Sequence, residues 1–145
     1  MKCMLDTCIF NWLIDGDILP EQLPSGAEYF ITHIQLDELA AVSSAERRNK
    51  LFAQLHALTP SNTPTESMIV GISRVGDCKI SDGHDYTEIL AALDQKKKKK
   101  NNAKDALIGE TALKNQYALL SADRALCDVM ESMGASVFRF SRRPY

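Results

Sequence analysis

Short apolar runs alternate along the chain with stretches whose apolar residues repeat at helical spacing. The apolar runs predict strands at 2–5, 29–31, 117–121 and 136–140, and a short edge strand in the turn-rich stretch 59–64. Helices are predicted at 8–14, from Thr32 onward, at 45–58, from Thr65 to about Val75, from Tyr86 to Asp94 or beyond, at 104–115 and at 124–133, with a loop at 76–83. Strands that alternate with helices indicate a parallel sheet covered on both faces, and therefore an α/β fold.

Several helix ends carry local signals. Thr32 and Gln35 have the spacing of a capping box, in which each side chain bonds a free backbone amide of the other residue. Gly16 and Gly134 stand where helices are expected to stop. In the helix at 104–115, the small residue Gly109 predicts a close approach of that helix to the sheet.

The composition is that of an ordinary globular domain. Hydrophobic residues make up 45% and charged residues 25% of the 145 residues, so we expect a single domain, 1–145, with one core. No apolar run reaches the roughly 20 residues of a membrane helix, and the first residues lack the features of a secretory signal, so a cytoplasmic protein is expected. The formal net charge of −2 argues against a non-specific nucleic-acid coat but not against a nuclease, because clustered acids lower the total.

The four cysteines predict neither a zinc site nor a disulfide framework. Cys3, Cys8, Cys78 and Cys127 form no Cys-x-x-Cys pair, and no histidine stands at zinc-ligand spacing from them. We therefore expect free thiols.

Two aspartates directly follow predicted strands. Asp6 follows the strand at 2–5, and Asp123 lies just beyond the strand at 117–121. Ligands of open parallel sheets bind beyond the carboxyl ends of the strands, so both carboxylates meet in one crevice if both strands are central. Taken alone, either aspartate is equally well explained as the cap of a turn.

Two further acids are candidates for the same crevice. Glu38 lies in the second turn of the helix that begins at Thr32, on a partly apolar face, and Asp105 lies in the first turn of a later helix, where the helix dipole favours a charged carboxylate. A solvated glutamate and an ordinary helix-terminal acid are the alternatives. Converging carboxylates repel one another unless a cation neutralises them, and oxygen-only ligands suit Mg²⁺ or Mn²⁺. Such a site hydrolyses phosphodiesters.

Four sequence blocks carry a family resemblance. In chain order they are Met4-Leu-Asp-Thr-Cys-Ile, Thr32-His-Ile-Gln-Leu-Asp-Glu-Leu, Lys104-Asp-Ala-Leu-Ile-Gly-Glu-Thr-Ala and Leu119-Leu-Ser-Ala-Asp. Together they resemble the acidic blocks of PIN-domain ribonucleases over nearly the whole chain, and the size is closest to the VapC-like toxins of toxin–antitoxin systems. Cys8 departs from the family, which commonly has Asn or Ser there, and the segment between Gly76 and Asp105 is longer than in many short toxins.

The resemblance implies a fold, a site and partners. The fold is a PIN-like α/β/α sandwich with a mostly parallel sheet of about four to five strands. The implied activity is hydrolysis of RNA by an endoribonuclease that binds Mg²⁺ or Mn²⁺, with a cognate antitoxin as partner, and dimers are common in that family. The implied metal ligands and catalytic residues are Asp6, Glu38, Asp105 and Asp123, supported by the hydroxyl groups of Thr7 and Ser121.

Basic and aromatic residues leave alternatives open. The run Lys96–Lys100 is either a solvated surface or a guide that steers RNA phosphates toward Asp105. Lys104 and Arg124 are candidate RNA-binding residues, and Arg142 and Arg143 offer contacts to phosphate or to the acids of a partner. Phe10 and Trp12 are expected in the core or an interface rather than as platforms for bases.

Two other function classes compete with the nuclease. One is a non-catalytic PIN-like scaffold in an RNA-processing assembly, which the retained acids disfavour. The other is a phosphate-handling enzyme or receiver domain on a similar sheet. Phosphatases of the haloacid dehalogenase type need Asp-x-Asp after the first strand, whereas Asp6 is followed by Thr7 and Cys8.

Overall fold

All strands of the central sheet run parallel. The computed structural model describes residues 1–69, 71–72 and 83–142. Within them the five strands have the spatial order β3-β2-β1-β4-β5. Their bounds are β1 Lys2–Leu5, β2 Glu28–Ile31, β3 Ser61–Asn62, β4 Ala118–Ser121 and β5 Val137–Arg139. The predicted α/β fold with a parallel sheet of four to five strands is confirmed.

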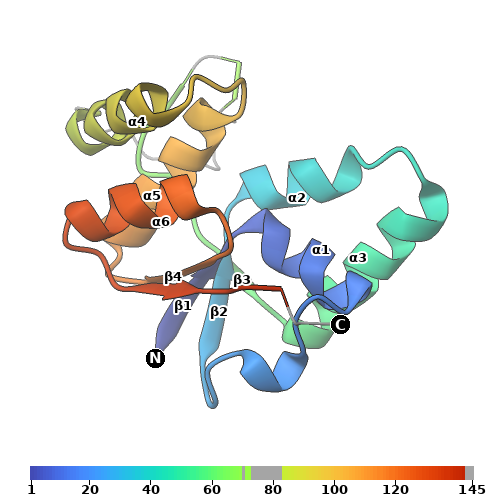
Figure 1. Ribbon diagram of the computed structural model, residues 1–145. Helices are drawn as coiled ribbons and strands as arrows, with labels where there is room; N and C mark the ends of the chain where they lie inside the picture. The colour runs from blue at the N-terminus through green and yellow to red at the C-terminus, as the bar shows by residue number, and fades with distance from the viewer. Residues whose placement is uncertain (70, 73–82, 143–145) are drawn as a thin grey trace.

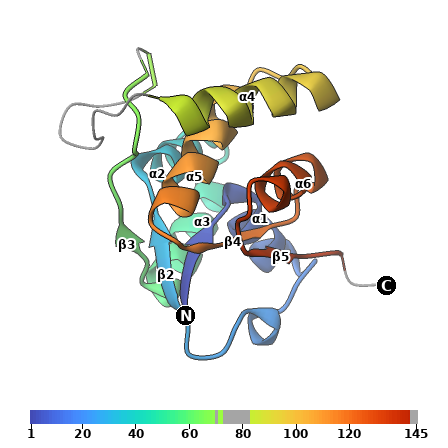
Figure 2. The same ribbon diagram turned by 90° about the vertical axis from the view of Figure 1, so that its left-hand side faces the viewer.

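Helices cover both faces of this sheet. They are α1 Thr7–Asp15, α2 His33–Ala40, α3 Ala45–Leu58, α4 His84–Lys96, α5 Asn102–Lys114 and α6 Arg124–Ser132, with a short 3₁₀ helix at Pro20–Gln22. Helices α1 and α3 lie on one face, and α4, α5 and α6 lie on the other (Figure 1, Figure 2). The molecule is therefore a sandwich of three layers.

The two central strands divide their side chains between two cores. On β1, Cys3 and Leu5 join the core beneath α1 and α3, whereas Met4 joins the core beneath α4, α5 and α6. On β4, Leu120 joins the core beneath α1 and α3, and Leu119 joins the core beneath α4, α5 and α6. Successive side chains of a strand point to opposite faces, so a strand covered on both sides must be apolar throughout. That is why these strands read as continuous apolar runs.

The local signals for helix ends are confirmed. Thr32 and Gln35 form the capping box of α2. Gly16 ends α1 in the left-handed region at φ 76°, and Gly134 follows α6 at φ 85°, a conformation that glycine adopts without a steric penalty. Helices α4 and α5 begin earlier than predicted, at His84 and Asn102.

The helix predicted from Thr65 is wrong over its described residues. Thr65 lies in an isolated bridge, and Glu66 and Ser67 form a bend. The backbone N–H of Glu66 donates to Thr111 Oγ1 at 3.3 Å, and Asn115 Nδ2 donates to Glu66 Oε1 at 3.1 Å. These bonds to α5 hold the segment along that helix, so tertiary contacts override its local helical pattern. Its predicted end at Val75 lies outside the described residues.

Gly109 serves a different contact from the one predicted. A Cβ atom placed on Gly109 would lie 2.7 Å from Met130 Sδ on α6 and 3.7 Å from Ile89 Cδ1 on α4. The missing side chain therefore permits close packing of α5 against two other helices, not against the sheet.

Other sequence predictions have mixed outcomes. The thiols of Cys3, Cys8 and Cys127 are free, whereas Cys78, Arg143 and the predicted loop up to residue 82 lie outside the described residues. Phe10 is fully buried in the core, as predicted. Trp12 packs against the core but is only half-buried, and it also lines a surface cavity, so its expected place in the core is only partly confirmed. Within the described ranges, no helix combines the length and apolar character needed to cross a membrane.

Candidate metal centre

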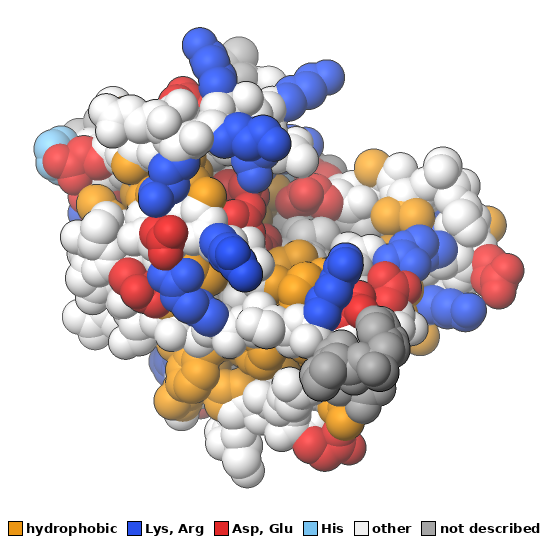
Figure 3. Space-filling model, viewed as in Figure 1, with side chains coloured by type: hydrophobic (Ala, Val, Ile, Leu, Met, Phe, Trp, Pro, Cys, Tyr) orange, Lys and Arg blue, Asp and Glu red, His pale blue; other side chains and the backbone are white. Residues whose placement is uncertain are grey.

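Four acidic side chains meet at the carboxyl end of the two central strands. The chain leaves β1 toward β2 on one side, and β4 leads to β5 on the other, so a crevice opens between these strand ends. Carboxylates from different elements line one pocket of about 350 Å³ there, and we call them the carboxylate cluster: Asp6, Glu38, Asp105 and Asp123. Figure 3 shows acidic side chains in a hollow near the middle of this face, with Lys and Arg side chains around it.

The Asp6 carboxylate is fixed on several sides. Ser121 Oγ donates to its Oδ2 at 2.6 Å, and Cys8 Sγ donates to the same oxygen at 3.5 Å. The backbone N–H of Thr7 donates to Oδ1 at 2.8 Å, so Asp6 also caps α1. Only 6% of the Asp6 residue is exposed to solvent, so protein groups rather than bulk water orient its carboxylate.

Two hydroxyl groups connect members of the carboxylate cluster. Thr7 Oγ1 donates to Glu38 Oε1 at 3.0 Å, which ties α2 to the start of α1. Ser121 Oγ accepts from the backbone N–H of Asp123 at 3.0 Å while it donates to Asp6. Asp123 in turn accepts the N–H of Leu126 at its Oδ1, at 3.2 Å, and so caps α6. The structure thus brings Thr7 and Ser121 into direct contact with the acids.

The electrostatics of the carboxylate cluster favour protonation when no cation is bound. Burial, followed by the charges of Asp6, Asp123 and Glu38, raises the pKa of Asp105 to about 8. Burial also raises the pKa of Asp6, against the opposing effect of its hydrogen bonds. The pKa of Glu38 is raised by burial and then by the charge of Asp6. Several carboxylates at one place cannot all ionise cheaply without a neutralising partner.

The lysine run reaches the pocket, which sequence reasoning left undecided. Lys99 Nζ lies 3.6 Å from Asp123 Oδ2, and Lys99 and Lys100 both line the pocket. The charge of Lys104 partly opposes the rise in the pKa of Glu38. Arg124 does not line this pocket and faces a neighbouring cavity instead.

Two neutral residues of α1 that line the pocket were not assigned a role from the sequence. Cys8 and Asn11 both line it. They lie on α1 beyond Asp6, and Asn11 stands four residues after Thr7. That helical spacing places Thr7 and Asn11 on one face and is the signal that would have found Asn11.

A second group with metal-ligand chemistry lies elsewhere. Among the described residues, His84, Asp85 and Glu88 at the start of α4 bring one ligand atom each within 4.8 Å of one another. Lys114 Nζ already pairs with Asp85 Oδ2 at 3.0 Å, and His84 and Glu88 are exposed. No three members of the carboxylate cluster meet that spacing. The oxygen-only donor set and the mutual repulsion of the carboxylate cluster nevertheless fit a hard divalent ion that keeps several waters.

Comparisons with known proteins bear on the fold. No family model matches the sequence, and a search of curated proteins gives no match. A chain of VapBC2 from Rickettsia felis, crystallised with a DNA fragment from its promoter, is similar with a TM-score of 0.57 and 19% identity, covering 96% of this chain and 98% of that chain.

Two further solved structures agree. One is a chain of VapBC-5 from Mycobacterium tuberculosis, a member of the VapBC family of toxin–antitoxin systems. Its TM-score is 0.52 and its identity 18%, and the match covers 96% of this chain and 98% of that chain. A domain of a functionally unknown protein from Methanocaldococcus jannaschii gives a TM-score of 0.55 and 14% identity, covering 99% of this chain and 94% of that chain. At these identities the likeness is one of fold, and the chain has the PIN-like α/β/α fold.

Proposed function

We propose that this chain is a metal-dependent endoribonuclease that hydrolyses RNA phosphodiester bonds, and that it acts as the toxin of a toxin–antitoxin pair. The observation that carries the proposal is the convergence of the carboxylate cluster in one pocket, with the pKa of Asp105, Asp6 and Glu38 raised. Clustered carboxylates of this kind are stabilised by Mg²⁺ or Mn²⁺, which suit oxygen ligands.

Each part of the pocket has a task in this proposal. The carboxylate cluster would hold Mg²⁺ or Mn²⁺, and the bound ion would supply a water of lowered pKa and positive charge for the leaving oxygen. Ser121 fixes the Asp6 carboxylate, and Thr7 fixes that of Glu38, so the ligands are oriented before an ion arrives. The raised pKa of Asp105 means that metal binding displaces a proton near neutral pH.

The substrate assignment rests on the cationic rim. Lys99 and Lys100 line the pocket, and Lys104 lies close enough to act on Glu38. These ammonium groups suit the phosphates that flank a scissile bond. RNA rather than DNA is chosen because the four acidic sequence blocks resemble those of PIN-domain ribonucleases.

The toxin assignment rests on the solved structures of similar fold. Two of them come from VapBC toxin–antitoxin systems and match almost the full length of both chains. We expect induced expression of the wild-type chain in bacteria to stop growth, and expression of Asp105→Asn to permit it. Growth arrest by both forms would show that toxicity does not depend on the carboxylate cluster.

Cleavage of RNA tests the enzymatic proposal. Wild type is compared with Asp6→Ala and Asp105→Asn in Mg²⁺ and in Mn²⁺, with chelator as the blank. Asp128→Asn is the matched control, because Asp128 is an exposed acid on α6 that lies outside the pocket. Wild type and the control should cut RNA, and both cluster variants should not. Equal activity in all four proteins would refute the proposal.

A further inference from the structure

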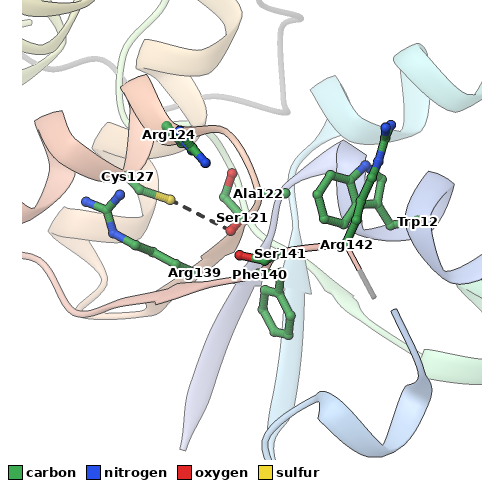
Figure 4. A pocket seen from close by; sticks show the side chains of 9 residues that line it. All are labelled: Trp12, Ser121, Ala122, Arg124, Cys127, Arg139, Phe140, Ser141 and Arg142. Carbon is green, nitrogen blue, oxygen red and sulfur yellow. Dashed lines mark hydrogen bonds between the residues drawn. The ribbon is translucent and has the colours of Figure 1, made fainter. Parts of the chain in front are cut away.

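A second cavity adjoins the carboxylate pocket on the side of β5. It has a volume of about 410 Å³, within the range of roughly 300–1,000 Å³ that is typical of ligand pockets. Figure 4 shows Trp12 and Arg142 on one side of it, Arg124 and Arg139 on the other, and the Ser121–Ala122 segment between them. We call it the arginine–tryptophan cavity.

The two cavities share a wall. Ser121 lines the arginine–tryptophan cavity, and its Oγ donates to Asp6 Oδ2 in the carboxylate pocket. The next residues along the chain are Ala122, which lines the cavity, and Asp123, which lines the pocket. A polymer that crosses the carboxylate cluster therefore has the cavity as its neighbouring contact.

The three arginines of the cavity are not equivalent. Arg139 is bound to Asp128 and Glu131, so its charge is committed to α6. Arg124 is exposed and forms no ion pair with any described residue, and in Figure 4 its side chain extends toward the Ser121–Ala122 segment. Arg124 is thus the cation of this cavity that is available to an anion.

Trp12 and Arg142 lie together opposite Arg124, and we call this pair the platform. The guanidinium carbon of Arg142 lies over the indole ring at 5.3 Å from its centroid. Arg142 Nε also lies 3.6 Å from Asp17 Oδ2, which fixes the guanidinium at one edge while the side chain stays 66% exposed. Guanidinium planes and aromatic rings are the surfaces on which unpaired bases stack.

We propose that the arginine–tryptophan cavity binds one unpaired nucleotide of the RNA strand, adjacent to the phosphodiester that the carboxylate cluster cuts. Arg124 holds the phosphate, and the base stacks on the platform of Arg142 and Trp12. The inference rests on the proposed function, whose substrate site it extends. An aromatic ring and a guanidinium beside Arg124, which among the described arginines of the cavity is the one without an ion pair, suit a nucleotide better than an acidic peptide, which has charge but no planar base. Duplex RNA does not fit, because its bases are already stacked and paired.

The chain provides its own reporter for this cavity. Trp12 is the only tryptophan, so tryptophan fluorescence reports on the platform alone. We would titrate the wild-type protein in EDTA, where RNA is not cut, with a short oligouridylate and a short oligoadenylate. Arg124→Gln and Arg142→Gln are the test variants. Lys50→Gln is the matched control, since Lys50 is an exposed cation on α3 that lines neither cavity.

Single-stranded RNA should change Trp12 fluorescence saturably. Each test variant should weaken the affinity by about tenfold, and Arg124→Gln should lower the salt dependence by about 0.7 in log–log slope. The control should bind as wild type does, and an RNA duplex should not compete. A fluorescence response that is absent, that the test variants leave unchanged, or that an oligoglutamate peptide or a duplex produces equally well would overturn the inference.

Cleavage in Mg²⁺, measured in parallel, separates this inference from the proposed function. Cleavage without any Trp12 response would leave the nuclease standing and remove the nucleotide site. A specific Trp12 response without cleavage would support the nucleotide site and remove the nuclease activity.

Discussion

Replacing Asp105 by asparagine should change how the stability of the metal-free protein depends on pH. The pKa of this carboxyl is raised from 3.8 to about 8 in the folded protein. Between those values the folded state holds a proton that the unfolded chain has released, so the free energy of unfolding falls as the pH rises. Asparagine cannot titrate, so Asp105→Asn should lose this part of the pH dependence.

The magnitude follows from the pKa shift. While Asp105 is protonated in the folded state and ionised in the unfolded state, the free energy of unfolding falls by about 1.4 kcal/mol for each unit of rising pH. Because the slope flattens near the folded pKa, wild type should lose about 2 kcal/mol between roughly pH 6 and pH 8 through Asp105 alone. For a chain of this length that corresponds to a fall in Tm of roughly 6 °C.

Thermal melts in EDTA across this pH range measure the effect as the difference between wild type and variant. Asp128→Asn is the control, because Arg139 lowers the pKa of Asp128 and keeps it charged throughout. Saturating Mg²⁺ should flatten the wild-type curve and leave that of Asp105→Asn unchanged. Parallel curves for wild type and Asp105→Asn in EDTA would refute the reasoning.

Three other substitutions test the surroundings of the carboxylate cluster. Thr7→Val removes a hydrogen bond to a cluster oxygen and should weaken Mn²⁺ binding about tenfold by calorimetry; Thr7→Ser should restore it. Lys99→Met removes the ammonium group that competes with a metal ion, so Mn²⁺ affinity should rise while RNA affinity falls, and Lys98→Met should change neither. Asn102→Ala removes two hydrogen bonds that hold the turn before α5. It should lower the free energy of unfolding, measured by chemical denaturation, by about 1–3 kcal/mol. It should also weaken RNA binding, as Lys99→Met does.

The sequence anticipated the placement of the acids because their positions depend on topology. Parallel strands put Asp6 and Asp123 at one edge of the sheet whatever the details of packing. The alternative explanation as turn caps holds only in part, since both aspartates cap helices rather than turns. One oxygen of Asp123 bonds the start of α6, while the other faces Lys99, so capping and a role in the pocket are compatible.

The sequence did not reveal which lysine reaches the pocket. Five identical side chains in a row carry no local signal, and the choice is made by the turn between α4 and α5. Asn102, which is 1% exposed, donates to Asp94 Oδ1 and to the carbonyl of Lys97, both at 2.8 Å. That buried anchor sets the path of the turn and brings Lys99 beside Asp123. The error at Thr65 has a similar origin, because contacts with a distant helix decided its conformation.

Mn²⁺ binding followed by electron paramagnetic resonance tests the central claim most directly, because His84, Asp85 and Glu88 offer a rival location for the ion. Wild type and His84→Ala should sequester Mn²⁺ with equal affinity, and Asp6→Asn and Asp105→Asn should bind it far more weakly. Failure of the wild type to bind Mn²⁺, or loss of binding in His84→Ala but not in Asp105→Asn, would contradict the account.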